Sequence, residues 1–256
     1  GRIGRVLVDP RDPDVVFACA VGHAYAPQAE RGVFRTLDGG ETWEKVLFVD
    51  EATGCSDIAM DPNNPRVLVA GMWQIQMDLS GLRSGGPGSG VYRSSDGGTN
   101  WEQLSGIGRG LPGGAGHPVG KLAVGIAPSD SNRWYVLAED TSPAFYRSDD
   151  AGDGWELVNT DHDLAERATY YTRFGIDSAN ADRVYFTSVR FSMSVDGGRS
   201  LVADPPRGGG DTHDVWIDPL DADRVMVADD GGLNISLDHG RTFRRIVLPI
   251  AQMYHV

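Results

Sequence analysis

The residues best suited to chemistry gather in one stretch, 211–230, around Trp216. Its acidic and imidazole groups are Asp211, His213, Asp214, Asp229 and Asp230. Carboxylates beside an imidazole can hold a divalent cation or act as general acid and base. Their spacing matches no established metal signature. These residues are therefore weak metal-ligand candidates, and the sequence predicts neither a bound metal nor a cofactor.

A pair of carboxylates is the minimum for glycoside hydrolysis, and the two groups must lie about 5 to 10 Å apart across a cleft. Asp57 and Asp214 are the candidate pair, because each occupies the same place in a repeated strand, described below. Asp211 is the substitute for either. Whether the protein is an enzyme is left open by the sequence.

Aromatic rings and cations suited to sugars or peptide carboxylates are spread along the chain. The ligand-binding candidates are Arg5, His23, Trp73, Arg83, Tyr170, Tyr171, Arg173, His213 and His255. The net charge of -13 argues against nucleic acid as a partner, because phosphate binding needs a basic surface. Almost all basic residues are arginines, so a local arginine site for a carboxylate is compatible with the acidic whole. No apolar run reaches the roughly 18 to 20 residues of a membrane span.

A hairpin motif that occurs five times must position these residues. Its copies read TLDGGETW, SSDGGTNW, SDDAGDGW, SVDGGRSL and SLDHGRTF, and their shared aspartates are Asp38, Asp96, Asp150, Asp196 and Asp238. These aspartates lie 42 to 58 residues apart, which fits the blade length of a β-propeller, with insertions in the earlier copies.

A second motif alternates with the first, as in VDPRDPDVVF and MDPNNPRVLV, and reads as two apolar strands joined by a Pro/Asp/Asn turn. One repeat is therefore four antiparallel strands, the composition of a propeller blade. We predict an all-β propeller of about five blades and a partial one, either one domain over 1–256 or part of a larger propeller. The repeats span about 1–50, 51–107, 108–160, 161–205 and 206–248, and 249–256 begins a further strand.

The Asp box has a structural explanation that involves no catalysis. Its Asp accepts hydrogen bonds from the turn, its Gly supplies positive φ, and its aromatic residue plugs the blade. Burial of each tryptophan should contribute about 1.5 to 3 kcal/mol. The aromatic positions are Trp43, Trp101, Trp155 and Phe243.

The first strand of each blade lines the central channel of a propeller. Four residues before the turn position, the five repeats carry Arg5, Asp57, Ala123, Arg173 and Asp214, with His255 in a sixth position. Two interpretations stay open. Either arginine and aspartate pair across neighbouring blades in a solvated channel, or they form a polar ligand pocket at one channel mouth.

Two features concern the compartment and the ends of the chain. Cys19 and Cys55 are too few for a disulfide framework and each lies in a strand-like stretch, which favours buried free thiols over one bridge. Gly1 opens directly on a strand pattern with no methionine or signal peptide, so the N-terminus is expected to be cut.

The boxes, with GVFRTLDGGETW and SGVYRSSDGGTNW as the best copies, resemble the BNR/Asp-box repeats of sialidases, xyloglucanases and sortilin-type receptors. Segments such as VGHAYAPQAERGVFRTLDGG, RATYYTRFGID and DTHDVWIDP resemble bacterial sortilin-like (VPS10-type) propellers, often labelled glycosyl hydrolases. The resemblance implies an exported protein, extracellular or periplasmic, with further blades in the parent chain.

Three functions follow as hypotheses. The first is a recognition module that binds a glycan, a peptide or a protein through channel and loop residues. The alternative is a glycoside hydrolase, xyloglucanase-like or sialidase-like, although the sialidase arginine triad is not recognisable here. The third is an assembly scaffold. The sequence predicts neither the ligand nor the oligomeric state.

Overall fold

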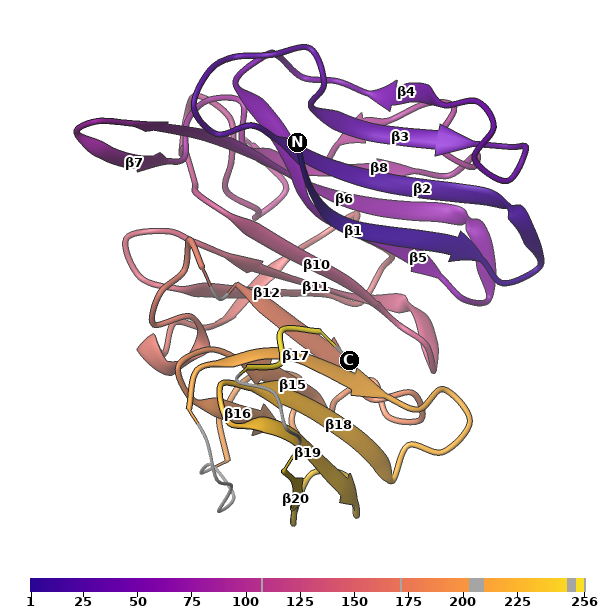
Figure 1. Cartoon of the computed structure of the whole chain (residues 1–256), viewed down its shortest axis with the longest axis vertical. Helices are drawn as coiled ribbons and strands as arrows, with labels where there is room; N and C mark the ends of the chain where they lie inside the picture. Colours follow the sequence, from indigo (N-terminus) through magenta and orange to yellow (C-terminus); the bar gives the residue numbers. More distant parts are fainter. Residues whose placement is uncertain (107, 171, 203–209, 248–251, 256) are drawn as a thin grey trace.

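The computed structural model describes residues 1–106, 108–170, 172–202, 210–247 and 252–255, and it is an all-β array of five antiparallel sheets. The sheets follow one another along the long axis of the molecule, with the first at one end and the fifth at the other (Figure 1). The predicted propeller architecture is thereby confirmed. One short 3-10 helix, η1 (His162–Leu164), is present in the described part.

The first three sheets follow the predicted repeat. Sheet one is β1 (Arg2–Asp9), β2 (Asp12–Gly22), β3 (Gly32–Thr36) and β4 (Glu44–Leu47). Sheet two is β5 (Thr53–Asp61), β6 (Asn64–Asp78), β8 (Gly90–Ser94) and β9 (Glu102–Gln103), and β7 (Gly81–Ser84) pairs with the long end of β6. Sheet three is β10 (Leu122–Ala127), β11 (Asp130–Ala138), β12 (Ala144–Ser148) and β13 (Glu156–Asn159).

The fourth sheet is the exception. It has three strands, β14 (Arg173–Ile176), β15 (Val184–Thr187) and β16 (Phe191–Ser194), and an isolated bridge from Met193 to Val202 stands in for the fourth strand. Sheet five is complete, with β17 (Thr212–Ile217), β18 (Arg224–Asp229), β19 (Gly232–Leu237) and β20 (Arg244–Ile246). The predicted further strand at 249–256 falls largely outside the described residues, and 252–255 form no strand.

The inner strands of the sheets lie side by side. Contacts run from β1 to β5, from β5 to β10, from β10 to β14 and from β14 to β17. Each inner strand reaches its partner through the short turn of the second motif, and Ala127 opposite Asp130 closes one such turn. Side chains at equivalent places on the five inner strands are thus brought to one region of the molecule.

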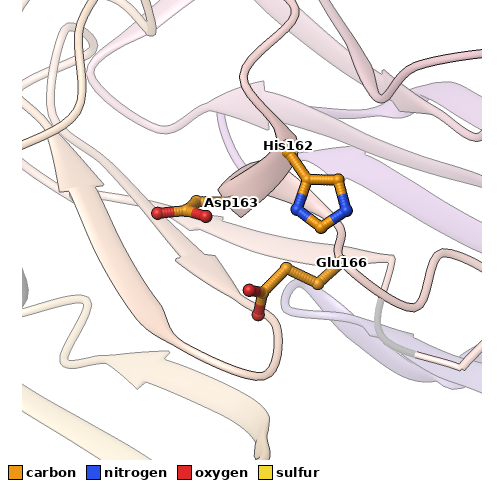
Figure 2. A group of neighbouring side chains, drawn as sticks. All are labelled: His162, Asp163 and Glu166. Carbon is orange, nitrogen blue, oxygen red and sulfur yellow. The ribbon is translucent and has the colours of Figure 1, made fainter.

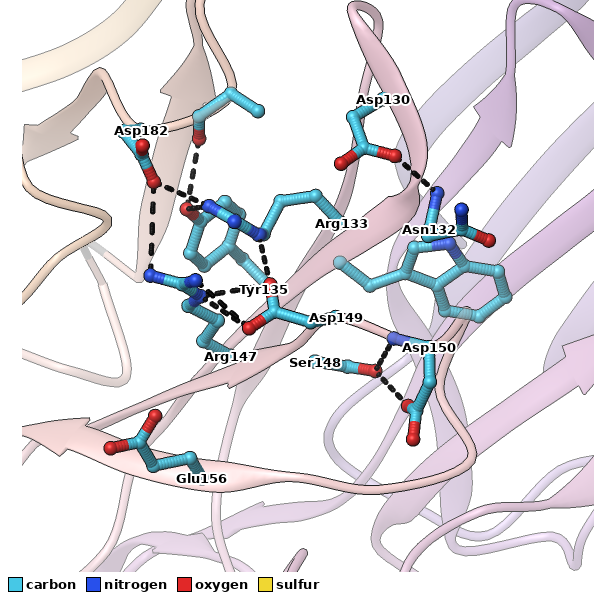
Figure 3. A network of polar contacts seen from close by, with 12 residues as sticks. Asp130, Asn132, Arg133, Tyr135, Arg147, Ser148, Asp149, Asp150, Glu156 and Asp182 are labelled. Atoms are coloured by element: carbon cyan, nitrogen blue, oxygen red, sulfur yellow. Dashed lines mark hydrogen bonds and ion pairs between the residues drawn. The ribbon is translucent and has the colours of Figure 1, made fainter.

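The Asp boxes are hydrogen-bonded turns. In the first, Asp38 Oδ1 accepts bonds from the Thr42 amide at 2.9 Å and the Thr36 hydroxyl at 2.6 Å, and the Thr36 oxygen accepts from the Gly40 amide at 2.9 Å. Ser148 and Asp150 repeat the pattern in the third box (Figure 3). Ala151 and His239 adopt positive φ, 56° and 59°, where the other boxes use glycine.

Acid should destabilise the fold through these boxes. Hydrogen bonds, first of all from the Thr36 hydroxyl to Asp38 and from the Asn100 amide to Asp96, lower the pKa of both carboxyl groups to about 2. Because the unfolded value is about 3.9, the stabilisation is complete above that pH and is lost as the pH falls toward 2. We expect the thermal midpoint to drop over this window, and Asp38→Asn or Asp96→Asn to flatten the drop. Midpoints measured from pH 2 to 7 test this, and an unchanged pH slope in both variants would contradict it.

The core lies between successive sheets. Phe17, Val33 and Leu47 of the first sheet pack against Ile58, Leu68 and Met72 of the second. Val69, Val91 and Leu104 of the second pack against Val124, Trp134 and Val136 of the third. Trp101, Trp155 and Phe243 are partly buried against these clusters and their counterpart in sheet five, as the plug role requires.

Trp43 does not follow this pattern, and its predicted burial is wrong. The side chain is 46% exposed, and so are the neighbouring apolar residues Ile3, Val6 and Val8 of β1, at 52 to 56%. In the other blades the box aromatic residue packs against the preceding blade. No described sheet precedes the first one, so Trp43 has nothing to plug against.

The expectation of free thiols is also wrong. Cys19 on β2 and Cys55 on β5 form a disulfide with a Cα–Cα distance of 5.0 Å, and it joins the first blade to the second. Both residues are fully buried in the cluster between these sheets. The bridge depends on the contact between two blades, which no pattern within one strand can reveal.

Ion pairs join the outer parts of the third and fourth blades. Arg133 and Arg147, both about one-eighth exposed, contact Asp149 on their own sheet and Asp182 on the next (Figure 3). The Tyr135 hydroxyl donates to the carbonyl of Ala181 at 2.8 Å. These contacts fix the angle between two neighbouring blades.

Candidate functional site

A pocket of about 350 Å³ opens where the inner strands meet. Residues from all five sheets and from the C-terminal segment line it. Its charged and aromatic lining residues are Arg2, Asp57, Trp73, Lys121, Tyr170, Arg173, His213, Tyr254 and His255. The pocket therefore combines cations, one carboxylate and aromatic rings in a single concave site.

Ion pairs cross from blade to blade at the floor of this region. Arg5 Nε lies 2.6 Å from Asp57 Oδ1, and Arg173 Nη1 lies 3.1 Å from Asp214 Oδ1. His255 Nδ1 lies 3.2 Å from the second oxygen of Asp214. The ring positions counted from the turn thus meet in space, and their arginines and aspartates pair across neighbouring blades.

Gly4 lets β1 approach its neighbour closely at this point. A Cβ atom there would come within 2.8 Å of the Ser56 carbonyl oxygen on β5. The Gly4 carbonyl also accepts a hydrogen bond from Arg173 Nη2 at 3.4 Å, so this guanidinium reaches from the fourth blade to the first. A larger residue at position 4 would widen the pocket floor.

Asp57 is engaged on both carboxylate oxygens. It is 6% exposed, and its second oxygen accepts a hydrogen bond from the Val124 amide at 3.1 Å. Attraction to Asp57, with a smaller contribution from Asp214, raises the pKa of Arg5 despite the burial of the guanidinium. Asp57 therefore joins three inner strands and keeps Arg5 charged.

Lys121 is the half-buried cation of the pocket. Its Nζ donates to the Tyr170 carbonyl at 3.1 Å and lies 5.8 Å from the centre of the Trp73 ring. Among the described residues no carboxylate lies within ion-pair distance of it. Burial, followed by repulsion from Arg173, lowers the pKa of Lys121 to about 8. The ammonium group is thus charged at neutral pH without a negative partner.

Aromatic side chains form one wall. The Tyr254 ring stacks on His213 with 3.9 Å between ring centres, and its hydroxyl lies 2.7 Å from that of Tyr170. The Tyr170 hydrogen bond is the main reason why the pKa of Tyr254 rises to about 12. His213 Nε2 is fixed by Asp230 Oδ1 at 2.7 Å. Tyr254 therefore stays neutral and presents a polar ring to the pocket.

Not every candidate residue reaches this site. Arg83 lies on β7, pairs with Asp78 and does not line the pocket. His23 is exposed on a loop, where its carbonyl accepts from Gln28 at 3.0 Å. Asp211 lies beside the pocket, 3.6 Å from Arg167. Tyr171 lies outside the described residues.

The weak metal candidates are occupied elsewhere. Asp229 Oδ2 accepts from the Asn234 amide, and Asp230, Asp214 and Asp211 bind the partners given above. In the described part, one other group brings possible ligand atoms within 4.8 Å of one another: His162, Asp163 and Glu166 near η1 (Figure 2). His162 is exposed and Asp163 lies 3.7 Å from Arg190, so two of its three members face solvent or another charge.

Sequence reasoning missed Arg2, Lys121 and Tyr254. One signal was available for Lys121: it stands two residues before Ala123, and alternate residues of a strand share a face. No such signal existed for Tyr254, because the path of the chain after the fifth blade decides where that ring lies.

Comparisons with known proteins bear on the fold. No family model matches the sequence, and no curated protein matches it. Among solved structures, an ancestral GH74 enzyme matches with a TM-score of 0.61 and 18% identity, over 95% of this chain and 32% of that one. The GH74 xyloglucanase from Xanthomonas campestris gives 0.52 and 14%, over 96% of this chain and 50% of that one. YCF48 from Cyanidioschyzon merolae gives 0.54 and 19%, over 94% and 71%.

At these identities the likeness shows the β-propeller fold alone. The chain spans between a third and a half of the GH74 chains that it matches. The broad resemblance to BNR/Asp-box propellers is thus supported, whereas the finer resemblance to sortilin-type propellers stays a prediction. In the described part, no helix has the length and apolar character needed to cross a membrane.

Proposed function

We propose that the protein is a recognition module whose channel-mouth pocket binds a carboxylate group on a peptide or glycan ligand. The observation that carries this proposal is Lys121, a half-buried ammonium group that lies in a concave site and has no carboxylate partner among the described residues. The site residues of this proposal are Arg2, Lys121 and Arg173, with Tyr254 beside them.

The charge balance of the pocket favours an anion. Arg173 and Arg2 both lower the pKa of Lys121, so the three cations repel one another. Asp57 does not relieve this repulsion fully, because Arg5 already engages it at 2.6 Å. A carboxylate bound among the three cations would form charge-assisted hydrogen bonds, which are about twice as strong as neutral ones. The pocket is thus an exception to the acidic character of the whole chain.

A hydrolase function has less support. Asp57 and Asp214 each form an ion pair with an arginine, and Asp57 also accepts a backbone amide and is almost fully buried. Catalytic carboxyls in a glycosidase must face the scissile bond, one of them as a proton donor. The likeness to GH74 enzymes does not alter this, because fold alone does not carry an activity.

The disulfide supports the export part of the proposal. Disulfides persist in oxidising compartments and are rare in the cytosol. The buried Cys19–Cys55 bridge is therefore consistent with a protein that works outside the cytoplasm.

Binding arrays test the proposal directly. Peptides that end in a free carboxylate should bind saturably, and the same peptides ending in a carboxamide should bind at least about tenfold more weakly. Oligosaccharides with and without a uronic acid, printed beside them, identify which source of the carboxylate the pocket prefers. Arg173→Ala should abolish the binding, with its thermal midpoint measured as a check on folding. Equal binding of acid and amide peptides, together with equal binding of acidic and neutral glycans, would contradict the proposal.

A further inference from the structure

One face of the first sheet is apolar and uncovered. We call it the leading face, and it consists of Ile3, Val6, Val8, Val16, Ala18 and Trp43. Ile3, Val6 and Val8 are each more than half exposed, and Trp43 is 46% exposed. A groove of about 640 Å³ runs over this face. An exposed apolar surface of this kind marks an interaction site.

The strand register shows that the face is continuous. Ile3 lies opposite Ala20, Val6 opposite Ala18, and Val8 opposite Val16. The other side of the same sheet carries Phe17, Cys19 and Val33, which pack against the second sheet. The first blade therefore has one buried face and one open face.

The repeat itself shows what normally covers a leading face. The positions that match Val6, Val16 and Ala18 are Ile58, Leu68 and Ala70 in the second blade, and Val124, Trp134 and Val136 in the third. All six are at most 5% exposed. Each set packs against the opposite face of the preceding blade, which in the second blade offers Val69, Val91 and Leu104.

From this equivalence we infer that the leading face binds a further Asp-box blade of the same polypeptide, contributed by residues outside 1–256. That blade would present apolar side chains in the places of Phe17, Val33 and Leu47. The fifth sheet offers a matching surface at the other end of the array, where Trp216, Met226 and Ile235 lie in register and are only partly buried. A blade has one face of each kind, so it fits against both ends.

A second copy of this chain is the competing occupant. The matched solved propellers favour the same polypeptide, because each is a longer chain of which this one covers 32 to 71%. Head-to-tail contact between copies generates a ring only if the rotation closes, and otherwise an open filament. A blade within the chain needs no such condition.

Charge placed on the leading face tests the inference. In residues 1–256 alone, Val6→Asp should leave the thermal midpoint nearly unchanged, because the side chain is already exposed. In the whole polypeptide encoded by the gene, the same change should lower the midpoint by at least about 5 °C, because it would bury a carboxylate. Leu37→Asp is the matched control: Leu37 lies on the same blade and is 61% exposed, but it is not on the leading face. It should have little effect in either protein.

Three results would overturn the inference. The first is an equal, small effect of Val6→Asp and Leu37→Asp in the whole polypeptide. The second is an encoded polypeptide with no Asp-box repeat beyond 1–256. The third is self-association of residues 1–256, measured by sedimentation, that Val6→Asp abolishes, because a second copy would then be the occupant.

Discussion

Replacing both Cys19 and Cys55 with alanine is expected to lower the free energy of unfolding by about 3 to 4 kcal/mol. The bridge closes a loop with a sequence separation of 36 residues, and a loop of that length gives about this value in the chain-entropy account. The first blade also packs against a neighbour on one face alone among the described sheets. The disulfide therefore holds the blade that has the least support from packing.

Urea unfolding of the oxidised protein, the reduced protein and the double alanine variant measures this effect. The reduced wild type separates loss of the bridge from loss of the sulfur atoms, and it should lie close to the variant. Hydrogen exchange should locate the extra opening in β1–β4. Equal stability of the oxidised and reduced proteins would show that packing, and not the bridge, holds the first blade.

Replacing Lys121 with methionine is expected to weaken carboxylate binding by about 10- to 100-fold, the range for a hydrogen bond to a charged group. Methionine keeps much of the length of the side chain and removes the charge. Because the pKa of Lys121 is about 8, the ammonium form is complete below that pH and is lost above it. Wild-type affinity should therefore fall as the pH rises through 8, and the variant should lack this decline.

Lys45 provides a matched control, because it and Lys121 are the two lysines of the chain. Lys45 Nζ donates to the Ala29 carbonyl and lies 3.9 Å from the centre of the Phe48 ring, outside the pocket. Calorimetric titration of Lys45→Met from pH 6 to 9 should match the wild type. A Lys121→Met protein with wild-type affinity and pH dependence would remove Lys121 from the site.

The repeat made most of the fold predictable. Two alternating motifs fixed the strands and turns, because apolar alternation, Asp/Pro turns and box glycines are local features. The disulfide and the exposure of Trp43 were not predictable in this way. Both depend on which blade lies beside the first, and that is a contact between distant parts of the chain.

The site was predictable to the extent that it follows strand register. Counting from the turn brought Arg5, Asp57, Arg173 and Asp214 to one region, where they form two ion pairs. Register could not show that these charges neutralise one another and leave Lys121 without a carboxylate. Side-chain reach between blades decides this, as it decides the stacking of Tyr254 on His213.

The most direct test of the carboxylate site is the titration of the lysines themselves. With ¹³C-lysine label, NMR resolves two side chains, and Lys45 serves as the internal reference. Without ligand, Lys121 should titrate near pH 8. Saturating acetate should raise the pKa of Lys121 and leave Lys45 unchanged, and the neutral isostere acetamide should alter neither. If Lys121 titrates identically in acetate, acetamide and buffer, the pocket does not bind a carboxylate at Lys121 and the proposed function is wrong.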